Sequence, residues 1–321
     1  MDRRTMLLAT LSALSTAAMA QEPHYPNKPV RIIVPTAPSG GVDLLARLVA
    51  QKLSERMGEQ FYVDNHPGAA GMIGTRVVAS SAPDGYTLLM APSSIAVTSA
   101  IKTGLPYDLR RDLTPIMMLA QTPYAFIVNP KLPVHSIKEL VAYAKAHPGE
   151  INLGSTGYGS TSHLAADLFS SMTGIKMTHV PNKGMGPAMN DVMSGVTSLL
   201  IGGLPPALAA AKSGRLRVLA VASAERSELM PDLPTAAEAG VPGFEVNNWI
   251  GLLAPAGLDS NLVQRLHDEV LAIINDPVNR KRLIAGGFEP GGSTPEIFAK
   301  QLRSDIQKWQ VIAQRAGLTQ K

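Results

Sequence analysis

A short run of glycine and hydroxyl residues, Thr36 to Gly41, separates a β-branched segment from an amphipathic stretch that begins near Asp43. Glycine lets the backbone approach a ligand closely, and a helix N-terminus offers unpaired N–H groups at the positive end of its dipole. The run therefore predicts a site for a carboxylate, with candidate residues Thr36, Pro38, Ser39, Gly40 and Gly41. The alternative is a tight turn in which Asp43 stabilises the helix start.

A second glycine-rich run, from Gly154 to His163, also stands between a short strand pattern and a helix pattern. It lacks the Gly-Lys-Ser/Thr ending of a Walker loop and the glycine spacing of a dinucleotide-binding turn. Alone it reads as a structural turn, but ligands of open α/β sheets sit at the carboxyl ends of strands. Its pairing with the first run predicts a second cradle for oxygen atoms, with candidate residues Ser155, Thr156, Gly157, Gly159, Ser160, Thr161 and His163.

Five further residues follow predicted strands and could line the same crevice, each with a structural alternative. Ser93 and Ser94 could contact ligand or cap the next segment. Asn182 could donate a hydrogen bond and Lys183 could supply a counter-charge, although a solvated loop lysine is as compatible with the pattern. Trp249 could wall the ligand or pack between the domains.

The residue pattern argues against catalysis and predicts no cofactor. The chain has no cysteine, and it contains neither a Gly-x-Ser-x-Gly elbow nor a His-Glu-x-x-His zinc motif. Its seven histidines lie singly, and His163 beside Ser160 and Ser162 is the nearest approach to a dyad. Because no orienting carboxylate accompanies it, the expectation is a binding protein; an exported hydrolase using the same cleft is the competing class.

The elements that must position these loops alternate between strand and helix. Strand patterns are predicted at 29–35, 61–63 and 86–90, with helices at 43–57 and 70–81, which is the βαβ order of a parallel sheet. A second series starts at 124–128 and continues through helices at 136–146, 161–172 and 186–194 and strands at 151–153, 176–180 and 216–221. An extended segment at 249–253 and helices at 261–275 and 295–316 complete the chain.

This order predicts an α/β protein of two lobes, a type II-like periplasmic binding fold with the ligand cleft between them. We expect lobe 1 to comprise residues 21–122 plus 245–321 and lobe 2 residues 123–244. Two extended crossings, near 122–128 and 244–253, would link the lobes as a hinge.

The N-terminal residues predict where the protein is located, and the net charge bears on its partners. Residues 1–20 combine Arg3 and Arg4, an apolar run and Ala18-Met-Ala20, the order of a cleaved secretory signal. No later segment is both long and apolar enough to span a bilayer, so a periplasmic protein that is not membrane-inserted is expected. The net charge of +4 is scattered, which argues against nucleic acid as a partner. A monomer is expected.

Several motifs in order along the chain resemble the substrate-binding proteins of tripartite tricarboxylate transporters, the Bug-type family. They are Tyr25 to Pro35, Pro67 to Gly74, Pro83 to Leu89, Tyr107-Asp108 with Asp112 to Ile116, and Trp249 to Gly257. The resemblance covers nearly all of the chain after residue 20. It implies a two-lobed protein that grips a small carboxylate, often a dicarboxylate, and delivers it to the membrane components of a secondary transporter. By this likeness, loops 36–41 and 155–163 would be the two jaws.

Two positions depart from the family pattern. Asn182 stands where an aromatic residue is common, and Val196-Thr-Ser198 where an acidic residue is frequent. The smaller side chain at 182 leads to the hypothesis of a larger or aromatic carboxylate, such as a benzene dicarboxylate. A sensor subunit that docks on a membrane receptor would keep the same fold and pocket, so it stays open as an alternative role.

Overall fold

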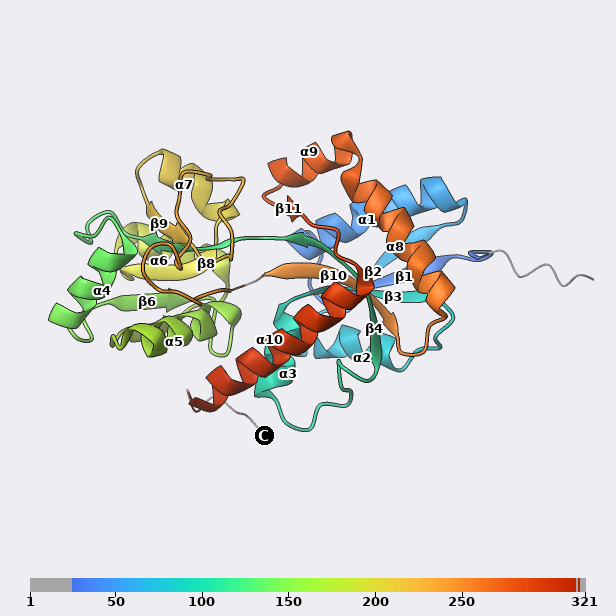
Figure 1. The fold of residues 1–321 in the computed structure, drawn as a ribbon, viewed down its shortest axis with the longest axis horizontal. Coiled ribbons are helices and arrows are strands. Elements are labelled where there is room, and N and C mark those ends of the chain that lie inside the picture. The colour runs from blue at the N-terminus through green and yellow to red at the C-terminus, as the bar shows by residue number, and fades with distance from the viewer. Residues whose placement is uncertain (1–24, 247, 316, 318–321) are drawn as a thin grey trace, which may run out of the picture.

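The computed structural model describes residues 25–246, 248–315 and 317, and the signal predicted for residues 1–20 lies outside them. The chain forms two sheets, each covered by helices, which are the right and left halves of Figure 1. The six-stranded sheet has the order β11-β4-β10-β3-β1-β2, and the five-stranded sheet has the order β7-β6-β8-β5-β9. We call the half with the six-stranded sheet lobe 1 and the half with the five-stranded sheet lobe 2. The predicted two-lobed α/β architecture is confirmed.

Lobe 1 contains the strands from both ends of the chain. These strands are β1 (Val30–Val34), β2 (Phe61–Asn65), β3 (Thr87–Pro92), β4 (Leu113–Gln121), β10 (Trp249–Pro255) and β11 (Glu289–Pro290). Its helices are α1 (Gly41–Met57), the short η1 (Ala69–Gly71), α2 (Met72–Ala79), α3 (Ser94–Ile101), α8 (Ser260–Asn275), α9 (Pro277–Ala285) and α10 (Pro295–Arg315).

Lobe 2 comes from one continuous stretch of chain. Its strands are β5 (Tyr124–Val128), β6 (Asn152–Ser155), β7 (Thr178–Pro181), β8 (Leu199–Gly203) and β9 (Arg217–Val221). Its helices are α4 (Ile137–Ala146), α5 (Thr161–Thr173), α6 (Met185–Ser194), the short η2 (Pro205–Ala207) and α7 (Leu208–Lys212).

Neither sheet is purely parallel, contrary to the simple βαβ prediction. β1 is parallel to β2 and β3, but β10 runs antiparallel to both β3 and β4. In lobe 2, β5 runs antiparallel to β8 and β9, whereas β6 is parallel to β7 and β8. β5 and β10 are the first strands after the chain crosses between lobes. Each enters its sheet from the end that faces the other lobe. Its neighbouring strands finish at that end, so it runs antiparallel to them.

The two crossings lie side by side and are bonded to each other. The Thr122 N–H donates to the Asn248 carbonyl at 2.8 Å, just beyond the pairing of Gln121 with Trp249. The carboxyl ends of β1, β2, β3, β6, β7 and β8 consequently meet at the two facing edges. This arrangement brings the predicted binding loops to the boundary between the lobes.

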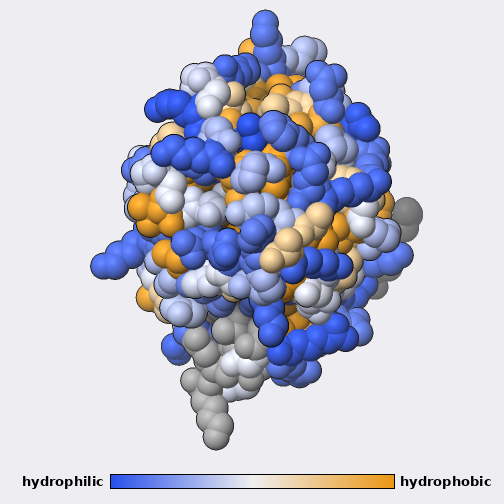
Figure 2. Space-filling view, turned by 90° about the vertical axis from the view of Figure 1, so that its left-hand side faces the viewer, coloured by the Kyte–Doolittle hydropathy of each residue, from blue (hydrophilic) through white to orange (hydrophobic). Residues whose placement is uncertain are grey.

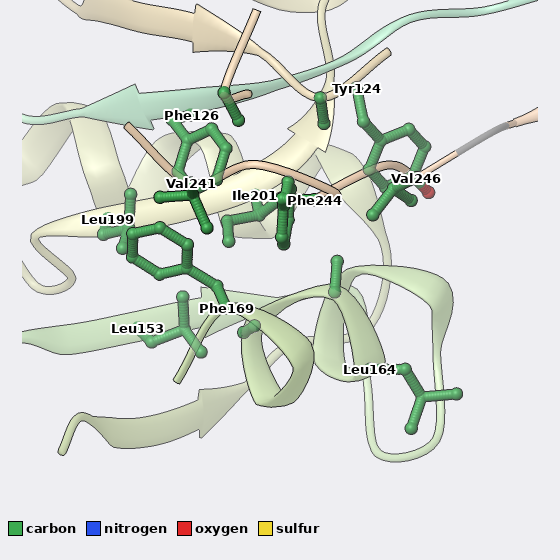
Figure 3. Packing of buried hydrophobic residues seen from close by; sticks show 14 of the residues in the cluster. Tyr124, Phe126, Leu153, Leu164, Phe169, Leu199, Ile201, Val241, Phe244 and Val246 are labelled. Atoms are coloured by element: carbon green, nitrogen blue, oxygen red, sulfur yellow. The ribbon is translucent and has the colours of Figure 1, made fainter. Parts of the chain in front are cut away.

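Each lobe has an apolar core built from the buried faces of its sheet. In lobe 2 the rings of Phe126, Phe169 and Phe244 pack at centroid distances of 4.8 to 5.7 Å (Figure 3). Trp309 of α10 and Ile101 of α3 join the same cluster, so these two lobe 1 helices also bind lobe 2 through apolar contact. On the outer face of lobe 2, apolar residues lie as separate patches among hydrophilic ones (Figure 2).

Several elements were not predicted from the sequence, chiefly β4, β8, α3 and α9. β4 contains Pro115, which argues against a central strand; it is tolerated because β11 pairs β4 only at Ala120 and Gln121, which leaves Pro115 on an open edge. β8 is five buried residues ending in two glycines, too short for a periodicity. Among the described residues, none of the helices combines the length and the apolar character that a membrane span requires.

Candidate functional site

Most of the helices that begin where the two lobes face each other start without a side-chain cap; α5, which follows β6 and is capped by Ser160, is an exception. α1, α2, α3 and α6 follow β1, β2, β3 and β7, and each starts without a side-chain cap. α4 and α8 begin at the opposite edges, and each is capped by a side chain, Ser136 and Asp259 respectively. Uncapped N-termini keep backbone N–H donors for another partner, and the helix dipole favours an anion there.

The first predicted loop is held in shape by a buried carboxylate. Asp43 is 2% exposed and accepts hydrogen bonds from the Ser39 N–H, Arg47 Nε and Asn65 Nδ2, each at 2.9 Å. Burial of this carboxyl acts to raise its pKa, but the hydrogen bonds outweigh burial, so the pKa of Asp43 lies below its ordinary value. Asp43 therefore stays ionised and fixes the loop, which is the structural role that the sequence left open.

The conformational freedom expected of Gly40 is not what this loop uses. Gly40 has φ −79°, which any residue can adopt, whereas Ser39 has φ +67° and takes the left-handed conformation. Gly41 matters for space, because a Cβ atom there would lie 3.2 Å from the Phe288 Cζ atom. Pro38, Ser39, Gly40 and Gly41 are exposed, and Thr36 is partly buried with its hydroxyl unpaired among the described residues.

The second predicted loop uses most of its own donors internally. The N–H groups of Thr156, Gly157 and Gly159 bind Ser162 Oγ, Ser155 Oγ and His163 Nδ1 at 2.8 to 3.1 Å. Ser160 Oγ donates to the Gly157 carbonyl and caps α5 through the His163 N–H. The open cradle of hydroxyls and amides expected here is therefore largely filled by the loop itself. As ligand contacts, these residues and the buried Thr161 remain predictions.

Two stacked imidazoles support that loop. The rings of His163 and His179 lie 3.8 Å apart and nearly parallel, and His179 Nε2 lies 2.6 Å from Ser155 Oγ. Burial, together with the neighbouring His163, lowers the pKa of His179 to about 4, and burial also lowers that of His163. Both rings are therefore neutral at physiological pH, and His163 serves the loop as an acceptor.

Asn182 and Lys183 lie beside this loop at the start of α6. The Asn182 N–H donates to the Ser155 carbonyl at 3.0 Å, and its side-chain Nδ2 is buried with no partner among the described residues. Lys183 is exposed, and Gly184, with φ +111°, leads into the uncapped α6. The structure thus places an amide, a cation and free helix N–H groups together on lobe 2.

The remaining candidates lie between the lobes or in the core. Ser93 is buried at the start of α3, where its hydroxyl donates to Asn248 Oδ1 on the second crossing; Ser94 beside it is partly exposed. Trp249 is fully buried, donates from Nε1 to Asp305 Oδ2 at 2.7 Å and packs edge-on against Phe298. Trp249 was predicted either to contact ligand or to pack. Its contacts here are packing contacts, because no part of the ring is exposed.

Comparisons with known proteins agree with this geometry. Residues 45–318 match the family described as the tripartite tricarboxylate transporter family receptor. The chain belongs to this family. It is 35% identical to protein BugT of Bordetella pertussis over 98% of both chains. The structure of Rpa4515 of R. palustris with adipate aligns with a TM-score of 0.77 at 36% identity, over 91% of this chain and 98% of that one. MatC of Rhodopseudomonas palustris with bound malate aligns with a TM-score of 0.74 at 29% identity, over 90% and 99%.

This periplasmic solute-binding receptor contains one more loop at the boundary between the lobes, which was not predicted from the sequence as a candidate binding loop. Gly68, Ala69, Ala70 and Gly71 all have positive φ, and they follow β2 at the edge facing lobe 2. Two alanines in the left-handed region are strained, and such strain is common at ligand-binding loops. The Pro-Gly-Ala-Ala-Gly motif in the sequence indicates this loop, but above it supports only the resemblance to the family.

The second departure from the family pattern lies away from these loops. Residues 196–198 precede β8, and the Ser198 N–H donates to the Asn152 carbonyl at the beginning of β6. Since β6 and β8 are parallel, this is the end of the lobe 2 sheet opposite to the binding loops. Asn182, the first departure, stands instead at the end of the sheet that faces lobe 1.

The receptor shows no arrangement suited to metal binding or nucleophilic catalysis in the part of the chain that is described. Histidine and acidic side chains do not gather there in groups of three that could hold a metal ion. Ser155 and His179 are in hydrogen-bonding distance, a pair the sequence did not reveal, but Ser155 is fully buried and cannot meet a substrate. The pair fastens the loop.

Proposed function

We propose that this receptor binds a small molecule with two or three carboxylates between its lobes and delivers it to the membrane components of a tripartite tricarboxylate-type transporter. The observation that carries the proposal is the contrast in helix caps. α1 and α6, which start where the lobes face each other, keep their N–H donors, whereas α5 at the same boundary and α4 and α8 at the opposite ends are capped by side chains. Donor groups of this kind suit carboxylates.

The two ends of the ligand would meet different donor sets. One carboxylate would lie at the start of α1, where Gly40 and Gly41 leave the backbone open on lobe 1. The other would lie at the start of α6, near Asn182 and Lys183 on lobe 2. Motion about the paired crossings would bring the second set onto the ligand after the first has bound it. Adipate and malate, bound to the similar proteins above, each carry two carboxylates.

Asn182 supports a ligand broader than a short aliphatic diacid. Its Nδ2 has no partner among the described residues, so it can donate to a ligand oxygen, and it fills less space than the aromatic residue common at this position. We infer that an aromatic dicarboxylate fits this side of the site. Asn182→Tyr should weaken binding of terephthalate more than that of malate, and an equal effect on both would reject the inference.

The test of the proposal is isothermal titration of the protein lacking residues 1–20 with malate, adipate, citrate, terephthalate, glucose and glycine. Saturable binding of at least one carboxylate, with no heat from glucose, is expected. Binding of glucose alone, or of no carboxylate, would overturn the proposal.

Delivery is tested by placing the receptor gene with its neighbouring membrane-component genes in a host that lacks uptake of the bound carboxylate. Uptake that requires both is expected. A receptor that instead changes the activity of a neighbouring histidine kinase, without uptake, would show the sensing role.

A further inference from the structure

Two residues of lobe 1, Gly287 and Glu289, reach across to lobe 2 beside the crossings. Gly287 lies between α9 and β11, and Glu289, the first residue of β11, pairs with Gln121 at the end of β4. The Glu289 Oε1 atom accepts a hydrogen bond from Ser227 Oγ at 2.5 Å and one from the Glu228 N–H at 3.2 Å. Ser227 and Glu228 follow β9 of lobe 2.

The backbone of Gly287 makes the second contact with lobe 2. A Cβ atom on Gly287 would overlap Pro205, which follows β8, so only a residue without a side chain permits this approach. Gly287 also has φ +82°, which glycine adopts without strain. The lobes therefore touch at two adjacent points of one short segment.

The hydrogen bond between Ser227 and Glu289 is partly buried, whereas the one from the Glu228 N–H is exposed. Ser227 is 1% exposed, and its hydroxyl also accepts from the Leu229 N–H, which leaves its single proton for Glu289. A salt bridge from Arg280 to Glu228, at 3.4 Å between exposed side chains, lies nearby and contributes little by comparison. Glu289 is half-buried, and its carboxylate accepts two hydrogen bonds from lobe 2; hydrogen bonds to an ionised carboxylate are stronger than neutral ones, so Glu289 dominates this contact.

The contact also borders a space that both lobes enclose. Glu289 and Gln121 of lobe 1 and Ser223 and Glu225 of lobe 2 line a cavity of about 420 Å³ beside the crossings. Rotation of one lobe against the other must change the width of this cavity and the Glu289–Ser227 distance together.

We propose that Gly287 and Glu289 of lobe 1, with Pro205, Ser227 and Glu228 of lobe 2, form a clasp that sets the population of the closed receptor. Its members are positioning residues, because they act on ligand affinity through the angle between the lobes. The effect on affinity rests on the proposed function, whereas the effect on the lobes does not.

The clasp acts without any contact to the ligand. When only the closed state completes the binding site, the apparent dissociation constant equals the intrinsic one divided by the closed fraction. Loss of the Glu289 hydrogen bonds lowers that fraction and weakens every ligand by a similar factor. A residue that touches ligand would instead change the preference between ligands.

The first experiment measures the distance between the lobes in the protein without ligand. The chain has no cysteine, so Ala272→Cys on α8 and Lys145→Cys on α4, both exposed, give two specific sites for spin labels. Double electron–electron resonance should show a shift to longer distances in Glu289→Ala and in Ser227→Ala. Glu225→Ala is the matched control, since it removes an exposed carboxylate from the same cavity wall and should leave the distances unchanged.

Two further comparisons separate a clasp from general loosening. The double variant Glu289→Ala, Ser227→Ala should open the protein no further than Glu289→Ala alone, because the hydrogen bond lost in Ser227→Ala is already absent without the Glu289 carboxylate. Gly287→Ala should open it as a wedge, and adding Pro205→Gly should restore the wild-type distances by removing the atoms that the methyl would meet.

Unchanged distances in both single variants, or additive effects in the double variant, would overturn the clasp. If titration finds a carboxylate, Glu289→Ala should raise the Kd of all bound carboxylates severalfold and equally. A change in their order would also overturn the proposal. Should no carboxylate bind, the distances still decide the clasp, so its failure is distinguishable from failure of the proposed function.

Discussion

The ring of Phe288 lies against the backbone of Gly41, 3.2 Å from where a Cβ atom of residue 41 would stand. Phe288 is 8% exposed in the core of lobe 1, and its neighbours Gly287 and Glu289 touch lobe 2. One segment therefore contacts both the start of α1, where a carboxylate is proposed to bind, and the opposite lobe. A displacement of the backbone at the start of α1 would therefore move Phe288 and, through its neighbours, the contact between the lobes.

This relationship predicts the effect of a single methyl group. Gly41→Ala should weaken carboxylate binding at least tenfold, because the new Cβ atom must displace either the Phe288 ring or the loop. The free energy of unfolding should fall by less than about 1 kcal/mol, since the ring can shift a few tenths of an ångström. Titration calorimetry and urea unfolding measure the two quantities. Unaltered affinity would separate residue 41 from the site.

A designed cap offers a sharper test of the helix start. Gly40→Asp should stabilise α1 by roughly a few tenths of a kcal/mol, because aspartate is a slightly better N-cap than glycine, and should abolish carboxylate binding by occupying the same N–H donors. Ala142→Asp on the exposed face of α4 adds the same charge elsewhere and should bind normally. If Gly40→Asp bound carboxylate as tightly as the wild type, the start of α1 would not be the anion site.

Asp43 should matter more for stability than for ligand chemistry. Asp43→Ala leaves the Ser39 N–H without its acceptor and the Asn65 Nδ2 with the Thr36 carbonyl alone, and the cost should be about 1–3 kcal/mol of unfolding free energy. The pKa of Asp43 is lowered in the folded state, so its contribution is present above the unfolded value near 4 and is lost as the pH falls through the folded pKa. Urea midpoints of wild type and variant should therefore converge below about pH 4.

His179 predicts a loss of stability at milder acidity. Its pKa of about 4 in the folded protein lies below the unfolded value of about 6.5, so between these values the unfolded chain binds a proton that the folded chain does not. The free energy of unfolding should decrease as the pH is lowered through this window, by at most about 1.4 kcal/mol per pH unit.

The control for this prediction is a second histidine variant. His179→Gln should flatten the pH profile of the unfolding free energy between pH 6.5 and 4, whereas His135→Gln, at an exposed position, should not. Parallel profiles for wild type and His179→Gln would show that His179 is not the responsible group.

The sequence located the two candidate loops because their signals are local. The β-branched run at 30–34 and the leucine spacing of 44–53 locate a strand and a helix, so Thr36 to Gly41 had to be the turn between them. The same logic located residues 156–160 between β6 and α5. The resemblance to a known family then supplied the arrangement of two lobes.

What the sequence could not indicate was which donors remain free. Ser155 and Ser160 looked like ligand donors, but both hydroxyls donate to the Gly157 carbonyl within the loop, which depends on side-chain geometry. The stacking of His179 on His163, 16 positions apart, and the bond from Glu289 to Ser227, 62 positions apart, depend on tertiary packing. Periodicity carries no information about such distant contacts.

The paired crossings have a consequence for the order in which the receptor can fold. Lobe 2 is encoded by consecutive strands from β5 to β9, so all of its sheet has left the translocation channel before residue 249 emerges. The sheet of lobe 1 cannot be completed until then, because β10 fills the place between β3 and β4. The half of the protein that starts first must therefore finish last, with the edges of β3 and β4 unpaired in the interval, when such edges are prone to association with other chains.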